Sequence, residues 1–263
     1  MRQANWLKPI SPKTVGRVLA ADVVANKFYT PGEARGSRVH DLFAKVAPRY
    51  DFINDLQSLG FHRRWKRRMV RMAEVQPGQR ALDVCCGTGD ISFALARAGA
   101  EVIGFDFSEA MLAVARRKLG GSNARPQFGQ GDAQELPFAA DTFDAVTVGY
   151  GLRNLPSWER GLEEMHRVAK PGGRLLVLDF GKPDNRLLRA LYFFYLRRLV
   201  PIFGNLFCGD AATHAYILES LLHYPAQRGI AEKMRNLGCQ DVRIVNLMGG
   251  AMSINYGVKS LNG

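Results

Sequence analysis

The feature that most constrains the fold is a short apolar run that leads into a glycine turn and then into a helix. The run reads Ala81-Leu-Asp-Val-Cys-Cys-Gly-Thr-Gly-Asp90, with glycines at Gly87 and Gly89. A strand, a glycine turn and a helix in this order present backbone N–H groups to a ligand at the helix N-terminus. Glycine removes the Cβ atom where backbone and ligand approach closely. The segment therefore predicts a nucleotide-binding turn in an α/β sheet.

A second apolar run follows at the spacing expected of the next strand. Val102-Ile-Gly-Phe105 ends at Asp106, which lies 19 residues after Gly87. An acidic side chain about 20 residues after the turn accepts hydrogen bonds from ribose hydroxyls. We therefore predict that Asp106 binds the ribose of the ligand.

The type of nucleotide is indicated by the residues around the turn. A dinucleotide fingerprint needs a third glycine at position 92, where this chain has Ser92. Asp83 lies four residues before Gly87. A carboxylate there would repel a pyrophosphate and attract the positively charged sulfonium of S-adenosylmethionine. The alternative is that Asp83 is a turn or helix-cap residue.

The positive charge of the chain is concentrated at its N-terminal side. The 263 residues carry a net charge of +12, and residues 1–80 hold 16 Lys and Arg against 6 Asp and Glu. The nucleotide-binding part is therefore nearly neutral. A basic N-terminal segment suggests an anionic partner, which would be a membrane surface, a nucleic acid or an acidic small molecule.

Cysteine content and hydropathy bound the cellular context. The four cysteines form neither a disulfide framework nor a pair of pairs at zinc spacing. We see no metal-ligand cluster and predict no metal. Residues 1–30 contain no signal-peptide core, and no run approaches the ~18 apolar residues of a membrane span. We therefore expect a cytoplasmic protein and leave open peripheral contact with the inner face of the membrane.

The central part of the chain alternates between strand and helix periodicity. Apolar runs typical of strands lie at 80–85, 101–105, 126–129, 143–149 and 173–180. Helical patterns lie at 90–98, 108–118, 157–170 and 226–237. Such alternation predicts a parallel, doubly wound α/β sheet. Two last runs, 242–247 and 254–258, are joined through Gly249 and Gly250 and predict an antiparallel hairpin at the sheet edge.

Two segments outside this alternation allow two interpretations each. Residues 1–36 form a basic extension, a helical pattern follows at 39–46, and 37–263 form the main domain. A helix at 61–72 carries an apolar stripe of Phe61, Trp65, Met69 and Met72, with Arg and Lys on its other faces. It is either an ordinary helix packed on the domain by this stripe or a basic interfacial helix. The apolar insertion at 182–225 is either a core helix pair or a lid over a hydrophobic substrate.

Several motifs together resemble a known family. The glycine turn, Asp106, Gly131-Asp-Ala-Gln-Glu-Leu-Pro-Phe138 and Arg167-Val-Ala-Lys-Pro-Gly-Gly173 resemble class I S-adenosylmethionine-dependent methyltransferases. More specific stretches are similar to the ubiquinone/menaquinone biosynthesis C-methyltransferases: Tyr50-Asp-Phe-Ile-Asn-Asp55, Gly60-Phe-His-Arg-Arg-Trp-Lys-Arg67, Gly151-Leu-Arg-Asn154 and Leu175-Leu-Val-Leu-Asp-Phe180. The resemblance covers about residues 38–260. It implies a Rossmann-like, seven-stranded methyltransferase sheet.

The resemblance also implies the cofactor S-adenosylmethionine and a role for each binding residue. Thr88 and the backbone at Gly87 and Gly89 would hold the methionine moiety, and Gly149 would lie beside it. Asp106 would bind the ribose, and Asp132 with the Ala133 backbone would bind the adenine edge. Asp132 has the alternative role of a turn residue. Met111 is a candidate for contact with the adenine, with a helical core position as the alternative.

The implied reaction is methyl transfer to a ring carbon of a polyprenylated quinol. The sulfonium is already a strong electrophile, so the protein has mainly to position the carbon nucleophile. A cation that stabilises the quinolate should help, and Arg153 is the first candidate for this role. The alternative for Arg153 is a structural salt bridge. Weaker candidates are Tyr50, Asp55, His62, Tyr150 and His223.

Other functions remain open from the sequence. A nucleic-acid methyltransferase would use the basic segment on phosphates, but the chain has no Asn-Pro-Pro-aromatic motif, so we expect no nucleic-acid substrate. A non-catalytic nucleotide-binding protein could keep the same fold. Between the two quinol pathways, Cys85-Cys86 in the glycine turn and Gly149 favour the menaquinone precursor, with the ubiquinone precursor as the alternative.

Overall fold

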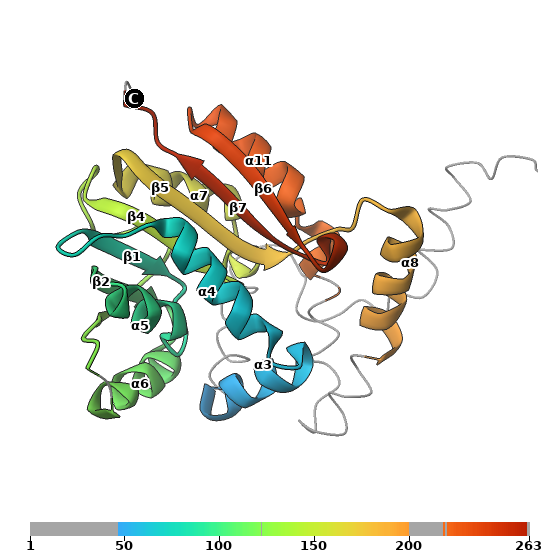
Figure 1. Cartoon of the computed structure of the whole chain (residues 1–263), viewed down its shortest axis with the longest axis horizontal. Coiled ribbons are helices and arrows are strands. Elements are labelled where there is room, and N and C mark those ends of the chain that lie inside the picture. The colour runs from blue at the N-terminus through green and yellow to red at the C-terminus, as the bar shows by residue number, and fades with distance from the viewer. Residues whose placement is uncertain (1–46, 122, 200–217, 219, 262–263) are drawn as a thin grey trace, which may run out of the picture.

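Seven strands form a single mixed sheet in the order β3-β2-β1-β4-β5-β7-β6 (Figure 1). The strands are β1 (Arg80–Val84), β2 (Glu101–Asp106), β3 (Gln127–Gln130), β4 (Phe143–Gly149), β5 (Ala169–Phe180), β6 (Gln240–Leu247) and β7 (Met252–Val258). The first five are parallel, and β7 runs antiparallel to both β5 and β6. The predicted doubly wound sheet with a terminal hairpin is confirmed.

The computed structural model describes residues 47–121, 123–199, 218 and 220–261. The predicted extension 1–36 and the helical pattern at 39–46 lie outside these residues, as does most of the second half of the predicted insertion. Within the described part, no helix is both long and apolar enough to cross a membrane.

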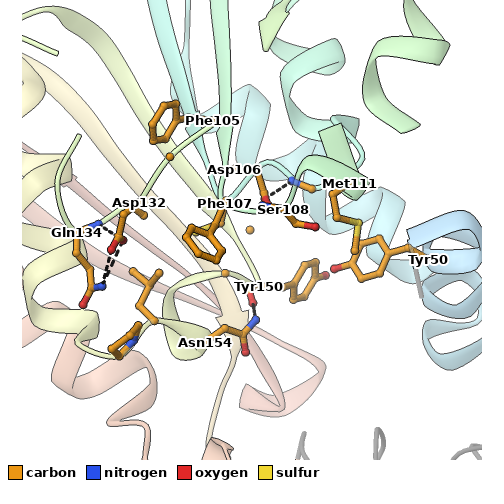
Figure 2. A pocket seen from close by; sticks show the side chains of 18 residues that line it. Tyr50, Phe105, Asp106, Phe107, Ser108, Met111, Asp132, Gln134, Tyr150 and Asn154 are labelled. Carbon is orange, nitrogen blue, oxygen red and sulfur yellow. Dashed lines mark hydrogen bonds between the residues drawn. The ribbon is translucent and has the colours of Figure 1, made fainter. Parts of the chain in front are cut away.

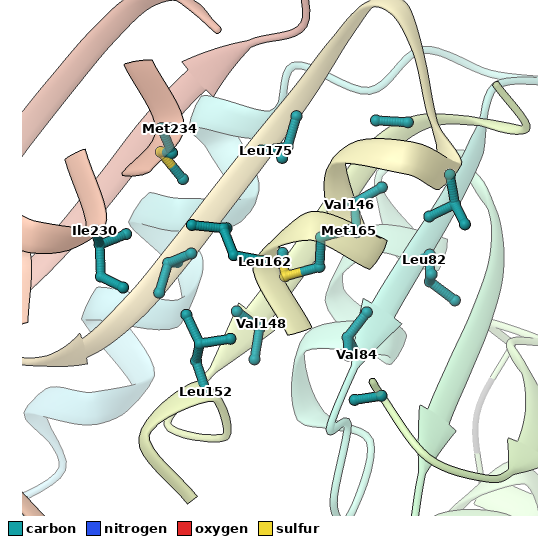
Figure 3. Close-up of a cluster of buried hydrophobic side chains, with 14 of the residues drawn as sticks. Leu82, Val84, Val146, Val148, Leu152, Leu162, Met165, Leu175, Ile230 and Met234 are labelled. Carbon is teal, nitrogen blue, oxygen red and sulfur yellow. The ribbon is translucent and has the colours of Figure 1, made fainter. Parts of the chain in front are cut away.

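Helices cover both faces of the sheet because the strand side chains alternate between two apolar cores. The helices are α3 (Tyr50–Ser58), α4 (Phe61–Ala73), α5 (Asp90–Arg97), α6 (Glu109–Lys118), α7 (Trp158–Val168), α8 (Arg186–Phe194) and α11 (Ala226–Asn236). Leu82 and Val84 of β1 face the core shared with α7 and α11, part of which is drawn in Figure 3. Ala81 faces the opposite core, which α4 and α5 close.

Local signals account for the ends of several elements. Helix α7 begins after Ser157, whose hydroxyl accepts a hydrogen bond from the backbone N–H of Arg160 at 3.2 Å. The predicted turn at 170–173 falls inside β5, where the pairing with β4 shifts register between Phe143 and Ala145. The strand therefore begins earlier than the sequence predicts, and the glycines mark a bulge rather than a separate turn.

Helix α4 packs on the domain with most of the apolar stripe that the sequence predicts. Met69 is buried and Trp65 and Met72 pack against the same core, whereas Phe61 is 41% exposed. The buried face extends beyond the stripe to Lys66, whose ammonium lies 2.9 Å from an Asp90 carboxylate oxygen on α5. An ion pair therefore fixes the helix in addition to the stripe, and the aromatic residue at its start stays outside.

Helix α8, the described start of the predicted insertion, buries none of its residues. It begins after Asn185, whose side chain accepts hydrogen bonds from the N–H groups of Leu187 and Leu188 at 2.9 and 3.0 Å. A single π-helical turn, Tyr195–Leu199, follows it. Tyr192 and Phe193 of α8 pack against the buried Leu196 and Leu221, and the choice between a core helix pair and a lid stays a prediction.

Candidate active site

A cleft lies at the carboxyl ends of β1, β2 and β4, where α3 approaches the glycine turn (Figure 2). Eighteen residues line it in Figure 2. Of the predicted binding residues, the lining includes Gly87, Asp106, Asp132, Ala133 and Gly149. Ligands of open α/β sheets bind at this edge, so the cleft is where the fold predicts it.

Asp106 links the end of β2 to the glycine turn. Its two carboxylate oxygens accept hydrogen bonds from the backbone N–H groups of Gly87 and Ser108, each at 2.8 Å. These two bonds fix the carboxylate at the cleft that it lines. A Cβ atom added at Gly87 would find its nearest neighbour, a Tyr50 ring carbon, 3.9 Å away, so there is open space over the turn.

Gly89 has a different role from Gly87 because it does not line the cleft. Its φ of 85° is left-handed, and an added Cβ would lie 2.9 Å from a Phe128 ring carbon. The residue is therefore required to be glycine by conformation and by the packing of the turn on β3. Its backbone contact with a cofactor stays a prediction.

Asp132 and Ala133 line the cleft on the side of β3. The Asp132 carboxylate accepts hydrogen bonds from the backbone N–H and the side-chain amide of Gln134, the first at 2.8 Å. It therefore makes the turn that we considered as its alternative role, and it also faces the cleft. Met111 is buried on α6 and lines the cleft, and its contact with the adenine stays a prediction.

Asp83 lies beneath the cleft and is not part of its lining. The side chain is fully buried, and its carboxylate accepts hydrogen bonds from the hydroxyls of Ser92 at 2.6 Å and Thr147 at 3.1 Å. Burial raises the pKa of Asp83 to about 7, although the two hydroxyls oppose the shift. Direct contact between Asp83 and a sulfonium stays a prediction. The hydrogen bond to Asp83 also explains why position 92 carries serine, where a dinucleotide fingerprint has its third glycine.

Thr88 faces the helices above the turn rather than the cleft. It is buried, and its hydroxyl donates to an Asp51 carboxylate oxygen of α3 at 2.6 Å. A methionine contact by this side chain would compete with that hydrogen bond. Thr88 therefore ties α3 to the glycine turn, and its predicted binding role stays untested.

Charged side chains extend this connection into a network. The Lys118 ammonium lies 2.7 Å from Asp51 and 3.1 Å from Asp90, and Lys66 lies 2.9 Å from the other Asp90 oxygen. Burial disfavours the charge on Asp90, but the two lysines outweigh it and hold the pKa of Asp90 well below its usual range. The network joins α3, α4, α5 and α6 above the glycine turn.

Two phenols face each other at the end of the cleft opposite Asp132 (Figure 2). Tyr150 follows β4 with a left-handed φ of 65°, and its buried hydroxyl has no hydrogen-bond partner among the described residues. Burial, and then the neighbouring Tyr50, raises the pKa of Tyr150 well above its usual value. Burial also raises the pKa of Tyr50, although Lys66 opposes the shift. Both phenols are therefore hydrogen-bond donors at neutral pH.

Arg153 is absent from the cleft lining and forms the buried ion pair that was its alternative role. Its Nε lies 3.1 Å from an Asp179 carboxylate oxygen, and the guanidinium stacks 4.8 Å from the Phe180 ring centroid. The Nε–H is not aligned for a hydrogen bond, so this is a charge contact. Burial raises the pKa of Asp179 although Arg153 opposes the shift. A catalytic role for Arg153 stays a prediction.

The remaining weak candidates separate into two groups. Asp55, His62 and His223 do not line the cleft, whereas Tyr50 and Tyr150 do. Asp55 pairs with Arg63 at 2.8 Å, and burial lowers the pKa of His62 to about 4. In the part of the chain that the structure describes, no three His, Cys, Asp or Glu side chains are grouped to hold a metal ion.

Sequence reasoning missed Asn154 and Gln134 as residues of the cleft. Asn154 accepts a hydrogen bond from Arg153 at 2.7 Å and donates to the Tyr150 carbonyl at 3.1 Å. Asn154 is the last residue of the Gly-Leu-Arg-Asn motif. The motif therefore pointed to this part of the cleft, but we assigned the functional role to Arg153. Gln134 stands two residues beyond Asp132, and nothing in the sequence distinguishes it from a surface residue.

Residues 32–259 match the ubiE/COQ5 methyltransferase family. The demethylmenaquinone methyltransferase of Halalkalibacterium halodurans is 40% identical over 231 residues, which cover 86% of this chain and 94% of that protein. The chain belongs to this family. A second member, the ubiquinone/menaquinone biosynthesis C-methyltransferase UbiE of Teredinibacter turnerae, is 40% identical over 86% of this chain and 93% of its own. The chain is therefore an S-adenosylmethionine-dependent C-methyltransferase, as predicted.

Solved methyltransferases share the fold at low sequence identity. A SAM-dependent methyltransferase from Thermotoga maritima is 18% identical with a TM-score of 0.61, over 84% of this chain and 100% of its own. Phosphoethanolamine N-methyltransferase 2 of Haemonchus contortus, in complex with S-adenosyl-L-methionine, is 18% identical with a TM-score of 0.58, over 75% of this chain and 52% of its own. The open space over Gly87 and the acceptors of Asp106 fit this cofactor.

Proposed function

We propose that the chain methylates a ring carbon of demethylmenaquinol. The observation that carries the proposal is the 40% identity to relatives named demethylmenaquinone methyltransferase, over more than nine tenths of their length. The second candidate is the ubiquinone precursor, because the similarly related UbiE carries both pathway names.

The cleft has two ends that suit the two halves of the cofactor. Asp106 would hold the ribose, and Asp132 with Ala133 would hold the adenine edge, because all three lie on the β2 and β3 side. Gly87 and Gly149 would lie beside the methionine half. The cofactor supplies an electrophilic methyl group when it is bound, so the protein has to position a carbon nucleophile in line with it.

Tyr150 and Tyr50 suit an acceptor that becomes negatively charged. A quinol ring is more nucleophilic at carbon when its hydroxyl has lost its proton. The two phenols are donors and not bases, since the pKa of each is raised. We infer that the Tyr150 hydroxyl donates a hydrogen bond to the quinolate oxygen and that Tyr50 closes the other side. Donors placed where charge develops stabilise the transition state.

The transfer is balanced without a further reactant. The ring carbon forms a bond to the methyl group, the sulfur keeps the electron pair of the broken carbon–sulfur bond, and the ring loses one proton as it regains aromaticity. Arg153 remains a candidate for stabilising the quinolate, but its ion pair with Asp179 suits a positioning role better. Through its 2.7 Å hydrogen bond to Asn154, it would hold the cleft wall after β4.

The apolar insertion is a candidate cover for the prenyl chain. On α8, Leu187, Leu191 and Phe194 recur at helical spacing and are all more than half exposed. An apolar face of this kind needs a hydrophobic neighbour, and a prenylated acceptor would supply one. We therefore keep 182–225 as the proposed lid, 1–36 as a basic extension, and a cytoplasmic location with peripheral membrane contact.

In the deciding experiment, purified full-length protein is mixed with labelled cofactor and one of two acceptors. The acceptors are demethylmenaquinol and the demethylated ubiquinol precursor, and the two reactions are measured side by side. We expect transfer to demethylmenaquinol with the larger kcat/KM. A larger kcat/KM for the ubiquinol precursor would replace the first proposal by the second. Cofactor binding without transfer to either quinol would contradict both.

A further inference from the structure

The outer face of α4 carries a row of arginines that the cleft does not use. Arginines on this α4 arginine face recur at i, i+3, i+4 and i+7 and are all exposed: Arg64, Arg67, Arg68 and Arg71. Residues at this spacing share one side of a helix. None of the four lies within ion-pair distance of a carboxylate in the described part of the chain, whereas neighbouring Arg63 pairs with Asp55. Four like charges are therefore held together without local compensation.

Helix α3 and the turn before α4 present large apolar side chains to solvent. Leu59 in the turn is 82% exposed, Phe52 on α3 is 63% exposed, and Phe61, the first residue of α4, is partly exposed. Leu59 has a left-handed φ of 49°, a conformation that favours glycine or asparagine over leucine. Neither backbone conformation nor packing inside the chain favours leucine here. We call these three residues the Leu59 tip.

The Leu59 tip and the start of α4 lie next to the cleft, and the arginine face continues from there along the helix, toward Glu74 and its partner Arg174 near the start of β5. Tyr50, on the same helix as Phe52, lines the cleft, and Thr88 of the glycine turn bonds to Asp51 beside it. Figure 1 shows α3 and the start of α4 beyond the carboxyl ends of the parallel strands. A partner that covered the Leu59 tip and the start of α4 would therefore lie beside the cleft.

We propose that the α4 arginine face and the Leu59 tip dock the enzyme on an anionic phospholipid bilayer. Arginines bind headgroup phosphates, and exposed leucine and phenylalanine enter the boundary between headgroups and acyl chains. A nucleic acid would use the arginines but offers nothing to the apolar tip. The inference rests on the proposed function, because a prenylated acceptor resides in the bilayer that the cleft then faces.

The first test measures partition of the full-length protein into vesicles of phosphatidylcholine alone and with phosphatidylglycerol. The triple variant Arg64→Gln/Arg68→Gln/Arg71→Gln should lower partition into the anionic vesicles about fivefold per arginine, on the order of 100-fold in all. The matched control removes the same charge elsewhere, with Arg97→Gln/Arg117→Gln/Arg235→Gln, three exposed residues on α5, α6 and α11. It should change partition less than about twofold.

Three results would overturn the proposal. They are equal losses in the two triple variants, no preference of the wild type for anionic vesicles, and displacement of the protein from the vesicles by duplex DNA at low concentration. Equal losses would indicate that net charge alone attracts the chain, and displacement by DNA would indicate a nucleic-acid surface.

A second variant tests the apolar part and keeps the fold intact. Leu59→Asn suits the left-handed conformation, so the unfolding temperature should stay the same or rise, while vesicle partition falls severalfold. Leu261→Asn is the control, because Leu261 is 75% exposed far along the chain at the last described residue. An unchanged partition of Leu59→Asn would exclude insertion of the tip.

Activity separates failure of this inference from failure of the proposed function. Transfer to a quinol without a prenyl chain in solution should be unchanged in the α4 triple variant, while transfer to prenylated quinol in anionic vesicles should fall with partition. Transfer by the wild type to neither quinol would refute the proposed function, and the partition data would still decide the docking. Full activity on vesicle-borne quinol despite lost partition would refute the docking.

Discussion

The two sides of the cleft are stabilised in different ways. We call the buried residues Asp83, Arg153 and Asp179 at the strand ends the floor, and the ion-pair network of Asp51, Lys66, Asp90 and Lys118 above the glycine turn the roof. In the floor, the Arg153 and Asp179 side chains are 7% and 3% exposed, and Asp83 of β1 is fully buried and accepts hydrogen bonds from the hydroxyls of Ser92 and Thr147. In the roof, Lys66 and Asp90 are 11% and 31% exposed, and Asp90 shares its charge with a second lysine. When a buried carboxylate loses the cation beside it, water cannot take over the lost stabilisation. A single substitution in the floor should therefore lower the unfolding free energy strongly, whereas a single substitution in the roof should lower it less.

The largest effect is expected from Arg153→Ala in the floor. The substitution leaves the Asp179 carboxylate buried without its charge partner, which typically costs about 3–5 kcal/mol of unfolding free energy. Denaturant unfolding measures the loss. A loss below about 1 kcal/mol would show that the floor is as adaptable as the roof.

The double variant Arg153→Ala/Asp179→Asn then separates stability from chemistry. Removing both charges should recover most of the lost stability, because no buried charge remains unpaired. If methyl transfer recovers together with stability, Arg153 acts only by pairing with Asp179, and neither its bond to Asn154 nor a contact with the quinolate is needed. If the refolded double variant binds cofactor but transfers no methyl group, Arg153 acts on the quinolate.

A smaller effect is expected from Lys66→Met in the roof. The variant keeps the apolar stem and loses one charged hydrogen bond, which is worth about 1.5–3 kcal/mol. Asp90 keeps Lys118 as its partner, so the fold should persist while the KM for the cofactor rises severalfold. The control is Lys170→Met, which breaks an exposed pair with Asp144 at the other end of β4 and should cost at most about 1 kcal/mol. Equal losses in both variants would contradict a special role for the roof network.

The same contrast explains what the sequence could predict. The strands, the hairpin and the position of Asp106 follow from local apolar periodicity and from spacing along one βαβ unit, so they were read correctly. The partners of Lys66 and Thr88 lie on other helices, and no periodicity indicates them. The sequence placed Lys66 on the solvent face of its helix because periodicity does not show that Asp90 of another helix lies beside it.

Asp83 shows the same limit inside the sheet. Its distance from Gly87 was read as a sign of contact with the cofactor, but side chains on a strand alternate between two faces. Which face Asp83 occupies depends on where Ser92 and Thr147 lie, and these residues come from α5 and β4. The sequence could therefore identify the turn but not the direction of the carboxylate.

A third prediction tests whether the floor responds to the charge of the cofactor. The pKa of Asp83 is raised to about 7, so at pH 7 roughly half of the carboxyl is protonated. A sulfonium nearby would lower this pKa, and up to about half a proton would be released on binding. Calorimetry in buffers of different ionisation enthalpy measures the release. S-adenosylhomocysteine, which lacks the positive charge, and Asp83→Asn are the controls that should release none. No release by the wild type would place Asp83 outside the influence of the sulfonium.

The same pKa sets how stability depends on pH. Because the folded pKa of Asp83 lies above the unfolded value of 3.8, the folded state binds more protons between these values, and stability decreases as pH rises through this window. Asp83→Asn should remove this contribution, so its unfolding temperature relative to the wild type should rise between pH 4 and about pH 8. A constant difference across the window would contradict the raised pKa.

The smallest effect on stability is expected from Tyr150→Phe, which lies where floor and roof meet. The Tyr150 hydroxyl is buried without a hydrogen-bond partner among the described residues, so its removal should leave the unfolding free energy within about 0.5 kcal/mol or raise it. If the hydroxyl donates to the quinolate, kcat should fall at least about tenfold, the equivalent of one hydrogen bond in the transition state. The control is Tyr224→Phe, an equally partnerless buried hydroxyl within the described part that packs on Trp158 away from the cleft. It should change neither quantity, and the KM for the cofactor should stay constant in both. Equal kcat values for both variants would show that Tyr150 does not act in the reaction. Tyr50 and Asn154 would then be the candidates for contact with the acceptor.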